Sequence, residues 1–200
     1  MYMPEIKIAP QELMRLYRAA EKKADMQAIM TGVLAAAVHL HSTCRWGIVA
    51  LLGFTGRCEA LLHSIAAREC TVFQLMDEIR TDAGIDIGIY ADKVRHSDDF
   101  LWRRKTIKPA TGIDNLRASE LAMLQERAML QERAEACYII PLYVACHYHG
   151  WRFERMRRLA TAMAHTIREI VVHDTWESLS DRLYKSSGVK ITSDGKVMID

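Results

Sequence analysis

The sequence predicts a mainly α-helical bundle that ends in a β-hairpin. Apolar residues recur at helical spacing through most of the 200 residues. Only ten residues are Gly and four are Pro, too few for a turn-rich all-β fold. Alternating apolar and polar residues on both sides of Asp194-Gly195 give the clearest β signal. Half the residues are hydrophobic and 26% are charged, which is typical of a globular chain with a hydrophobic core.

The first two helices are predicted on either side of Asp25. Pro10 suits the first turn of a helix, which we expect to end near the lysines at 22–23, where cations favour the helix dipole. Asp25 is placed to cap a second, apolar helix that ends near Cys44.

Residues 26–44 carry no formal charge, so a membrane span has to be weighed against a buried helix. The polar residues within this stretch and the interruption at Arg45 favour a helix buried in a helical domain, and we expect no membrane contact. A third helix is predicted over 48–67, and we interpret Gly53 and Gly56 within it as positions of close helix packing.

A short fourth helix is predicted between two specific end signals. Thr71 and Gln74 have the spacing of a capping box, in which a hydroxyl and a side-chain amide satisfy backbone groups at the helix start. Gly84 is placed to end this helix. The polar stretch 92–105 can form a further helix.

The domain organisation follows from a stretch with Pro and Gly in the middle of the chain. We predict an N-terminal helical unit over 1–105, a linker over 106–115 and a C-terminal unit over 116–200.

A seven-residue tandem repeat over 122–134 lengthens one helix while keeping its apolar stripe in phase, which makes homodimerisation through this helix plausible. Pro141 is expected to kink or break that helix.

The C-terminal elements are two helices and the hairpin. One helix is predicted over 151–172, and a short one over 175–187 that Gly188 closes. The hairpin over 189–199 turns at Asp194-Gly195, and we expect it to lie against helices or a partner, because an isolated hairpin is marginally stable.

The two halves of the chain show a weak internal repeat. The segment 71–87 parallels 175–191, with a Thr at the start and a Gly followed by alternating apolar residues at the end. Upstream, His39-x-His41 is echoed by His147-x-His149, and Gly47 by Gly150. The fold would then consist of two related helical units.

The segment from His147 to Met156, with the helices and the Gly-Val-Lys-Ile ending that follow it, resembles small helical proteins encoded by phages of Gram-positive bacteria. Those proteins carry an aromatic-Gly-aromatic-Gly-x-x-Arg-Leu turn. In this chain His149 stands at the first aromatic position, Arg152 at the second Gly and Met156 at the Leu. The resemblance implies a phage or mobile-element origin and no defined activity.

The cysteines indicate a reducing compartment. Their number is odd, none is part of a Cys-x-x-Cys pair, and the N-terminus has no apolar export signal. We therefore expect mostly buried, reduced thiols in a cytoplasmic protein, namely Cys44, Cys58, Cys70, Cys137 and Cys146.

Two clusters of Cys and His residues could face each other and together supply ligands for a metal ion. Residues two apart on a helix point about 200° apart, so His39 and His41 cannot both ligate from a regular helix. We expect no metal and no cofactor, and keep a Cys/His metalloenzyme as an alternative. The clusters are His39, His41 and Cys44, and Cys146, His147 and His149.

The best functional signal is a pair of basic patches with aromatic residues. The sequence holds no nucleophile elbow, phosphate-binding loop or paired-carboxylate motif, so binding is favoured over catalysis. Arginines can contact phosphates and aromatic rings can stack on bases. The patches are Trp102, Arg103, Arg104 and Lys105, and Trp151, Arg152, Arg155, Arg157 and Arg158.

Two kinds of partner fit these patches. A nucleic acid or a nucleoprotein complex is expected, and a host-defence nuclease with its bound nucleic acid is one such target for a phage inhibitor similar to an anti-CRISPR protein. The alternative is a host protein bound without nucleic acid, because Arg and Trp are also common anchors of protein interfaces. The net charge of +2 does not separate the two.

Overall fold

A computed structural model describes residues 10–95, 133–173 and 175–199 of the chain. It is mainly helical and ends in a two-stranded antiparallel hairpin, which confirms the predicted fold class. The elements are α1 (Pro10–Ser42), α2 (Ile48–Ala66), α3 (Val72–Ala83), α4 (Ile87–Arg95), a helix over 133–149, α6 (Phe153–His173), α7 (Trp176–Ser187), β1 (Val189–Ile191) and β2 (Val197–Ile199).

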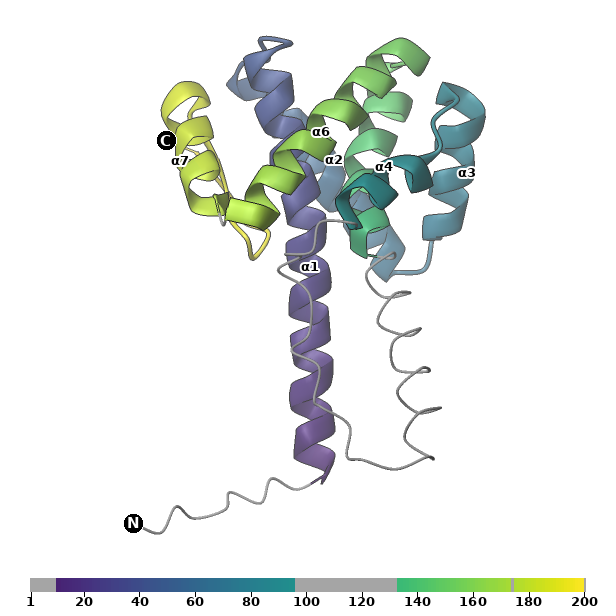
Figure 1. Ribbon diagram of the computed structural model, residues 1–200, viewed down its shortest axis with the longest axis vertical. Coiled ribbons are helices and arrows are strands. Elements are labelled where there is room, and N and C mark those ends of the chain that lie inside the picture. Colours follow the sequence, from purple (N-terminus) through teal and green to yellow (C-terminus); the bar gives the residue numbers. More distant parts are fainter. Residues whose placement is uncertain (1–9, 96–132, 174, 200) are drawn as a thin grey trace.

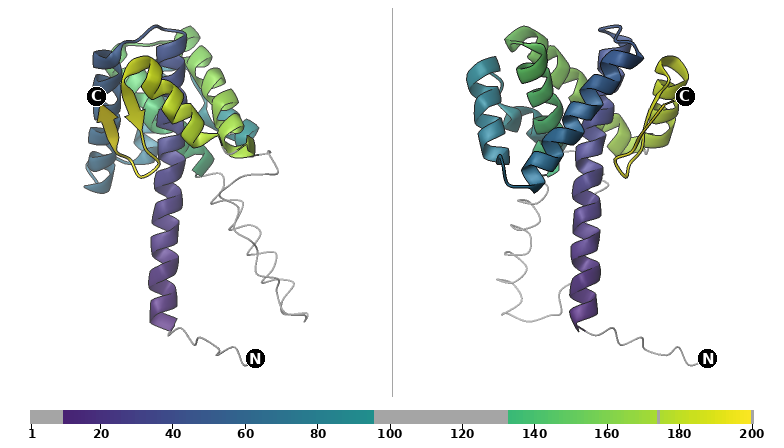
Figure 2. Two further views of the ribbon diagram at one scale, coloured as in Figure 1. Left: turned by 90° about the vertical axis from the view of Figure 1, so that its left-hand side faces the viewer. Right: turned by 180° about the vertical axis from the view of Figure 1, so that it is seen from behind.

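The C-terminal half of α1 is the centre of the bundle. Figures 1 and 2 show α6 crossing one side of α1 and α2 the other, while the N-terminal half of α1 extends beyond the other described elements. Most residues from 28 to 40 are buried. Gly32 allows the closest approach, because a Cβ at this position would lie 1.8 Å from the carbonyl oxygen of Cys137. The uncharged stretch of the sequence is thus a buried helix.

The helix end predicted before Asp25 is wrong, and of the kink or break predicted at Pro141 the break is absent. The chain does not begin a new helix at Asp25, since α1 is continuous from Pro10 to Ser42. The Asp25 carboxylate instead accepts a hydrogen bond from the Arg133 guanidinium at 2.9 Å, so it ties α1 to the helix over 133–149. That helix also continues through Pro141, which is buried, to residue 149.

The helix α2 confirms the predicted third helix, but its two glycines are not positions of close helix packing. Gly53 and Gly56 are exposed, and a Cβ on either would meet nothing within 4 Å among the described atoms. By length and composition alone α2 could cross a membrane, and 28% of its apolar window is buried. One such helix is weak evidence of a span, because core helices of soluble proteins pass the same test.

The capping box at α3 is present as predicted. The backbone N–H of Gln74 donates to the Thr71 hydroxyl, and the Gln74 side chain accepts from the backbone N–H of Thr71 at 2.8 Å. Gly84 ends the helix in the left-handed region at φ 66°. Asp86 then starts α4 by accepting a hydrogen bond from the N–H of Gly88 at 3.0 Å.

The C-terminal helix and the hairpin form one unit against α1 and α2 (Figure 2). Gly188 ends α7 at φ 75°, as predicted, whereas Thr175 occupies the N-cap position without a capping hydrogen bond. The buried hydroxyl of Ser180 donates to the carbonyl of Ile191, which fixes β1 on α7. The strands pair with Val189 opposite Ile199.

Elements from both predicted units contribute to one hydrophobic core, in which α1 and α4 pack on α6. The predicted linker over 106–115 lies outside the described residues, as does the tandem repeat over 122–134 except for its last two residues. The helix face predicted for homodimerisation therefore also lies outside them.

Candidate functional site

Two turns of similar geometry meet at one end of the bundle, where α1 passes into α2 and the helix over 133–149 passes into α6. The backbone N–H of Trp46 donates to the carbonyl of Leu40 at 3.1 Å, and the backbone N–H of Trp151 donates to the carbonyl of Ala145 at 3.2 Å. The residue before each tryptophan has a positive φ, and each following helix begins two residues after the tryptophan. We call residues 43–47 and 150–152 together the double turn.

This geometry changes the register of the internal repeat. The sequence comparison matches Gly47 with Gly150, but the backbone matches Trp46 with Trp151. The positive-φ residues are then Arg45 (56°) and Gly150 (63°). The sequence alignment missed this match because glycine occupies the left-handed position in only one of the turns.

Trp151 lies in the core of the double turn. Its exposed fraction is 8%, and its ring centroid is 6.0 Å from that of Trp46. Trp46 also packs against Phe54 at 6.2 Å and against His149 at 4.7 Å. Trp151 is therefore a packing residue in this structure, and its ring is not presented to solvent for stacking on a base.

A second layer of polar contacts covers these rings. The Arg57 guanidinium donates to Nε2 of His149 at 3.2 Å and lies 5.0 Å above the centroid of the Tyr148 ring. Because Nε2 is the acceptor, His149 is held as the neutral tautomer with its proton on Nδ1. Burial, and then the charge of Arg57, lowers the pKa of His149 below its ordinary value.

Four exposed arginines lie in or beside the double turn. Arg45 and Arg152 belong to it, and Arg57 on α2 contacts His149, whose ring packs against Trp46. Arg152 donates weakly to Sγ of Cys146 (3.8 Å) and to the Trp151 carbonyl (3.4 Å). Arg155 lies close enough to Cys44 to oppose the rise in the pKa of that thiol, which burial causes.

Arg158 lies one turn beyond Arg155 on the outer face of α6. Within the described residues, none of these five guanidinium groups forms an ion pair with a carboxylate. We refer to the five together as the arginine surface: Arg45, Arg57, Arg152, Arg155 and Arg158. The exposed face of α6 continues with His165, Arg168 and His173.

The predicted site residues are thus divided by the structure. Arg152, Arg155 and Arg158 are exposed near one another, whereas Arg157 is paired with Glu154 at 3.0 Å. Sequence reasoning missed Arg45, which lies in the turn before α2, and Arg57, which contacts Tyr148 and His149 only in the fold. The other patch lies outside the described residues: Trp102, Arg103, Arg104 and Lys105.

Members of both Cys/His clusters make contacts with other residues. His41 donates from Nδ1 to the carbonyl of Trp46 at 2.9 Å, and His147 stacks on Tyr143 with centroids 5.1 Å apart. Within the ranges that the structure describes, no three His, Cys, Asp or Glu side chains are arranged to hold a metal ion. The five cysteines are free, and three of them are buried.

Comparison with known proteins gives no match to a family model, a curated protein or a solved structure.

Proposed function

We propose that the chain binds a nucleic acid, alone or within a nucleoprotein complex, through phosphate contacts made by the arginine surface. The observation that carries the proposal is a set of exposed guanidinium groups on both turns, on α2 and on α6, none of which is paired with a carboxylate among the described residues. Guanidinium groups match phosphate oxygens with paired N–H donors, and arginine remains charged at any physiological pH.

The buried position of Trp151 favours contacts with the phosphate backbone over contacts with bases. Phosphate contacts fix the position of a protein on nucleic acid but carry no sequence information. Tyr148 is half-exposed, but Arg57 already lies over its ring. We therefore expect weak sequence preference and an affinity that depends strongly on salt.

A paired charge reversal on α6 tests this proposal. Fluorescence anisotropy with a short labelled DNA or RNA oligonucleotide is expected to show that R155E/R158E weakens binding at least about tenfold. The slope of log affinity against log salt, measured between about 50 and about 200 mM salt, should fall by about 2, because two phosphate contacts are lost.

The matched control reverses two exposed arginines on other helices, Arg80 on α3 and Arg182 on α7. R80E/R182E changes the net charge by the same amount, so it should retain most of the affinity. Unchanged binding by R155E/R158E, or an equal loss in both variants, would contradict the proposal.

A protein partner is a second candidate, which one observation favours. Phe73 is 82% exposed on α3, and Phe153 is 49% exposed at the start of α6, where its ring lies beside Gly84. Exposed aromatic residues next to arginines are typical of protein interfaces. A complex captured from host extract at moderate salt after nuclease treatment would support this candidate over the first.

The sequence resemblance extends the proposal to a biological setting. A cytoplasmic phage protein with this surface would act on a host nucleoprotein complex, as a non-catalytic inhibitor of host defence. Affinity purification from the host, with nuclease-treated and untreated samples compared, would identify such a target and show whether nucleic acid is needed to hold it.

A further inference from the structure

A cavity of about 500 Å³ opens between α1, the second half of α2 and the tip of the hairpin, remote from the double turn. Ligand pockets for small molecules have volumes of roughly 300–1,000 Å³, so this cavity is large enough to hold one. Its walls are mainly apolar and include Met26, Met30, Val33, Cys58, Leu62 and Val197.

Among the described residues that line this cavity, no buried side-chain polar atom lacks a hydrogen-bond partner. The hydroxyl of Thr55 is used inside α2, where it donates to the carbonyl of Leu51 at 3.1 Å. Burial raises the pKa of the Cys58 thiol, which therefore stays neutral. A ligand inside the cavity would gain from burying apolar surface and would find no partner for a buried charge.

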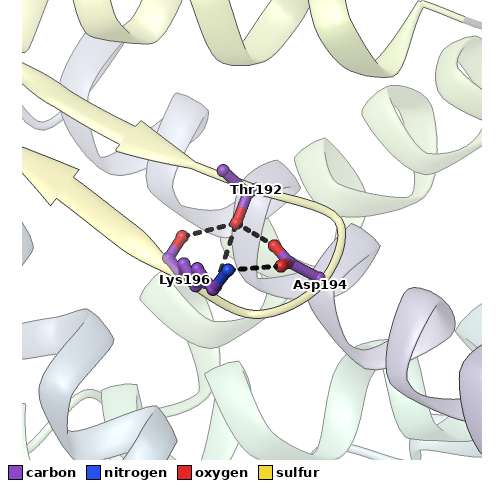
Figure 3. A network of polar contacts seen from close by, with 3 residues as sticks. All are labelled: Thr192, Asp194 and Lys196. Carbon is purple, nitrogen blue, oxygen red and sulfur yellow. Dashed lines mark hydrogen bonds and ion pairs between the residues drawn. The ribbon is translucent and has the colours of Figure 1, made fainter.

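The hairpin forms a preorganised wall. The Thr192 hydroxyl accepts a hydrogen bond from the backbone N–H of Lys196 at 2.9 Å and contacts the Asp194 carboxylate, which also pairs with the Lys196 ammonium at 3.2 Å (Figure 3). Gly195, at φ 92°, lies against the sulfur atoms of Met26 and Met30. Methionine side chains adapt to the shape of a ligand, so one wall is fixed and the opposite wall can adjust.

The titratable groups that line the rim of the cavity are Glu59, His63 and Asp194. Glu59 is exposed, and its carboxylate is 4.0 Å from Nε2 of His63, which is too long for a hydrogen bond. Asp194 is also at the rim, but Lys196 offsets its charge. Glu59 is therefore the rim group best placed to receive a positive charge.

We propose that this cavity binds a small amphipathic cation, with its apolar body between the methionines and its ammonium group beside Glu59. The charge of the rim selects a cation over an anion, and the interior selects an apolar chain over a polar one. This site is separate from the arginine surface and does not depend on the function proposed for it.

Isothermal titration with octylammonium, octanoate and octanol tests this assignment. Octylammonium is expected to bind one-to-one and to raise the unfolding temperature, and octanoate to bind more weakly or not at all. A66W should abolish binding, because Ala66 lines the cavity from an exposed position and a large side chain there can fold into it. A67W is the matched control, since Ala67 is exposed next to it but does not line the cavity.

Removal of the rim charge tests the cation preference separately. E59Q should weaken octylammonium binding about twofold to fivefold, as expected for a partly exposed ion pair, and E69Q, outside the cavity, should not. The proposal is overturned if octylammonium shows no saturable binding, if A66W binds as well as A67W, or if octanoate binds as tightly as octylammonium. Binding of an amphipathic helical peptide in place of octylammonium would overturn it as well, and would assign the cavity to a protein partner.

Discussion

The indole rings of Trp46 and Trp151 meet edge to face, with their centroids 6.0 Å apart and their planes at 81°. They belong to turns that are more than a hundred residues apart in the sequence. Because each tryptophan also closes its own turn through its backbone N–H, this contact fixes the two turns relative to each other. The positions of the arginines that surround the double turn follow from it.

Replacement of Trp151 separates packing from binding. W151A is expected to lower the free energy of unfolding by about 3–5 kcal/mol, as for other buried tryptophans. W151F should keep most of the stability and nearly all of the nucleic-acid affinity, because only 8% of Trp151 is exposed. Urea denaturation and anisotropy on the same preparations measure both effects. A large loss of affinity in a well-folded W151F would show instead that the indole contacts the ligand.

The two threonines that precede α3 and α7 should differ in their importance for stability. T71A removes a capping hydrogen bond and should lower the free energy of unfolding by about 1 kcal/mol. T175A removes a buried hydroxyl that has no hydrogen-bond partner among the described residues, so no loss or a small gain is expected. Chemical denaturation of both variants measures the difference. Equal losses would show that Thr175 caps α7 in solution.

Local signals in the sequence predicted local structure well. The Thr71 capping box, the left-handed glycine at 84 and the turn at Asp194-Gly195 all rely on interactions between residues close in the chain. The helix start predicted at Asp25 was wrong because an Asp side chain can also pair with a residue that is distant in the sequence. The partner of Asp25 is Arg133, which no pattern of neighbouring residues can reveal. Pro141 is likewise tolerated inside a buried helix.

The candidate site was predictable only in part for the same reason. The spacing of Arg155 and Arg158 places them on one side of α6, and the structure confirms their exposure. Nothing in the sequence near Arg57 indicates that its guanidinium contacts His149, which is 92 residues away. The burial of Trp151 depends on Trp46 in the same way.

The glycines of α1 and α2 are expected to respond to alanine in opposite directions. G32A places a methyl group against the backbone of Cys137, so it should lower the free energy of unfolding by about 3 kcal/mol or more. G53A adds a methyl group in open space on a helix and should raise the free energy of unfolding by about 0.5–1 kcal/mol. Thermal and urea denaturation test both. A destabilised G53A would reveal that this face of α2 is covered in solution.

The stability of the fold should decrease as the pH falls through the range in which His149 titrates. Burial and the Arg57 charge hold the pKa of this imidazole below 6.5 in the folded protein, so below about pH 6.5 the unfolded chain binds more protons and folding is disfavoured. Half-buried His39, whose pKa partial burial also lowers, adds to this loss. H149Q keeps an acceptor for Arg57 but cannot titrate. Urea denaturation at about pH 7.5 and about pH 5.5 should therefore show a smaller loss of stability in H149Q than in the wild type, with H165Q on the exposed face of α6 as the control. An unchanged loss in H149Q would mean that the hydrogen bond between Arg57 and His149 does not govern the acid response.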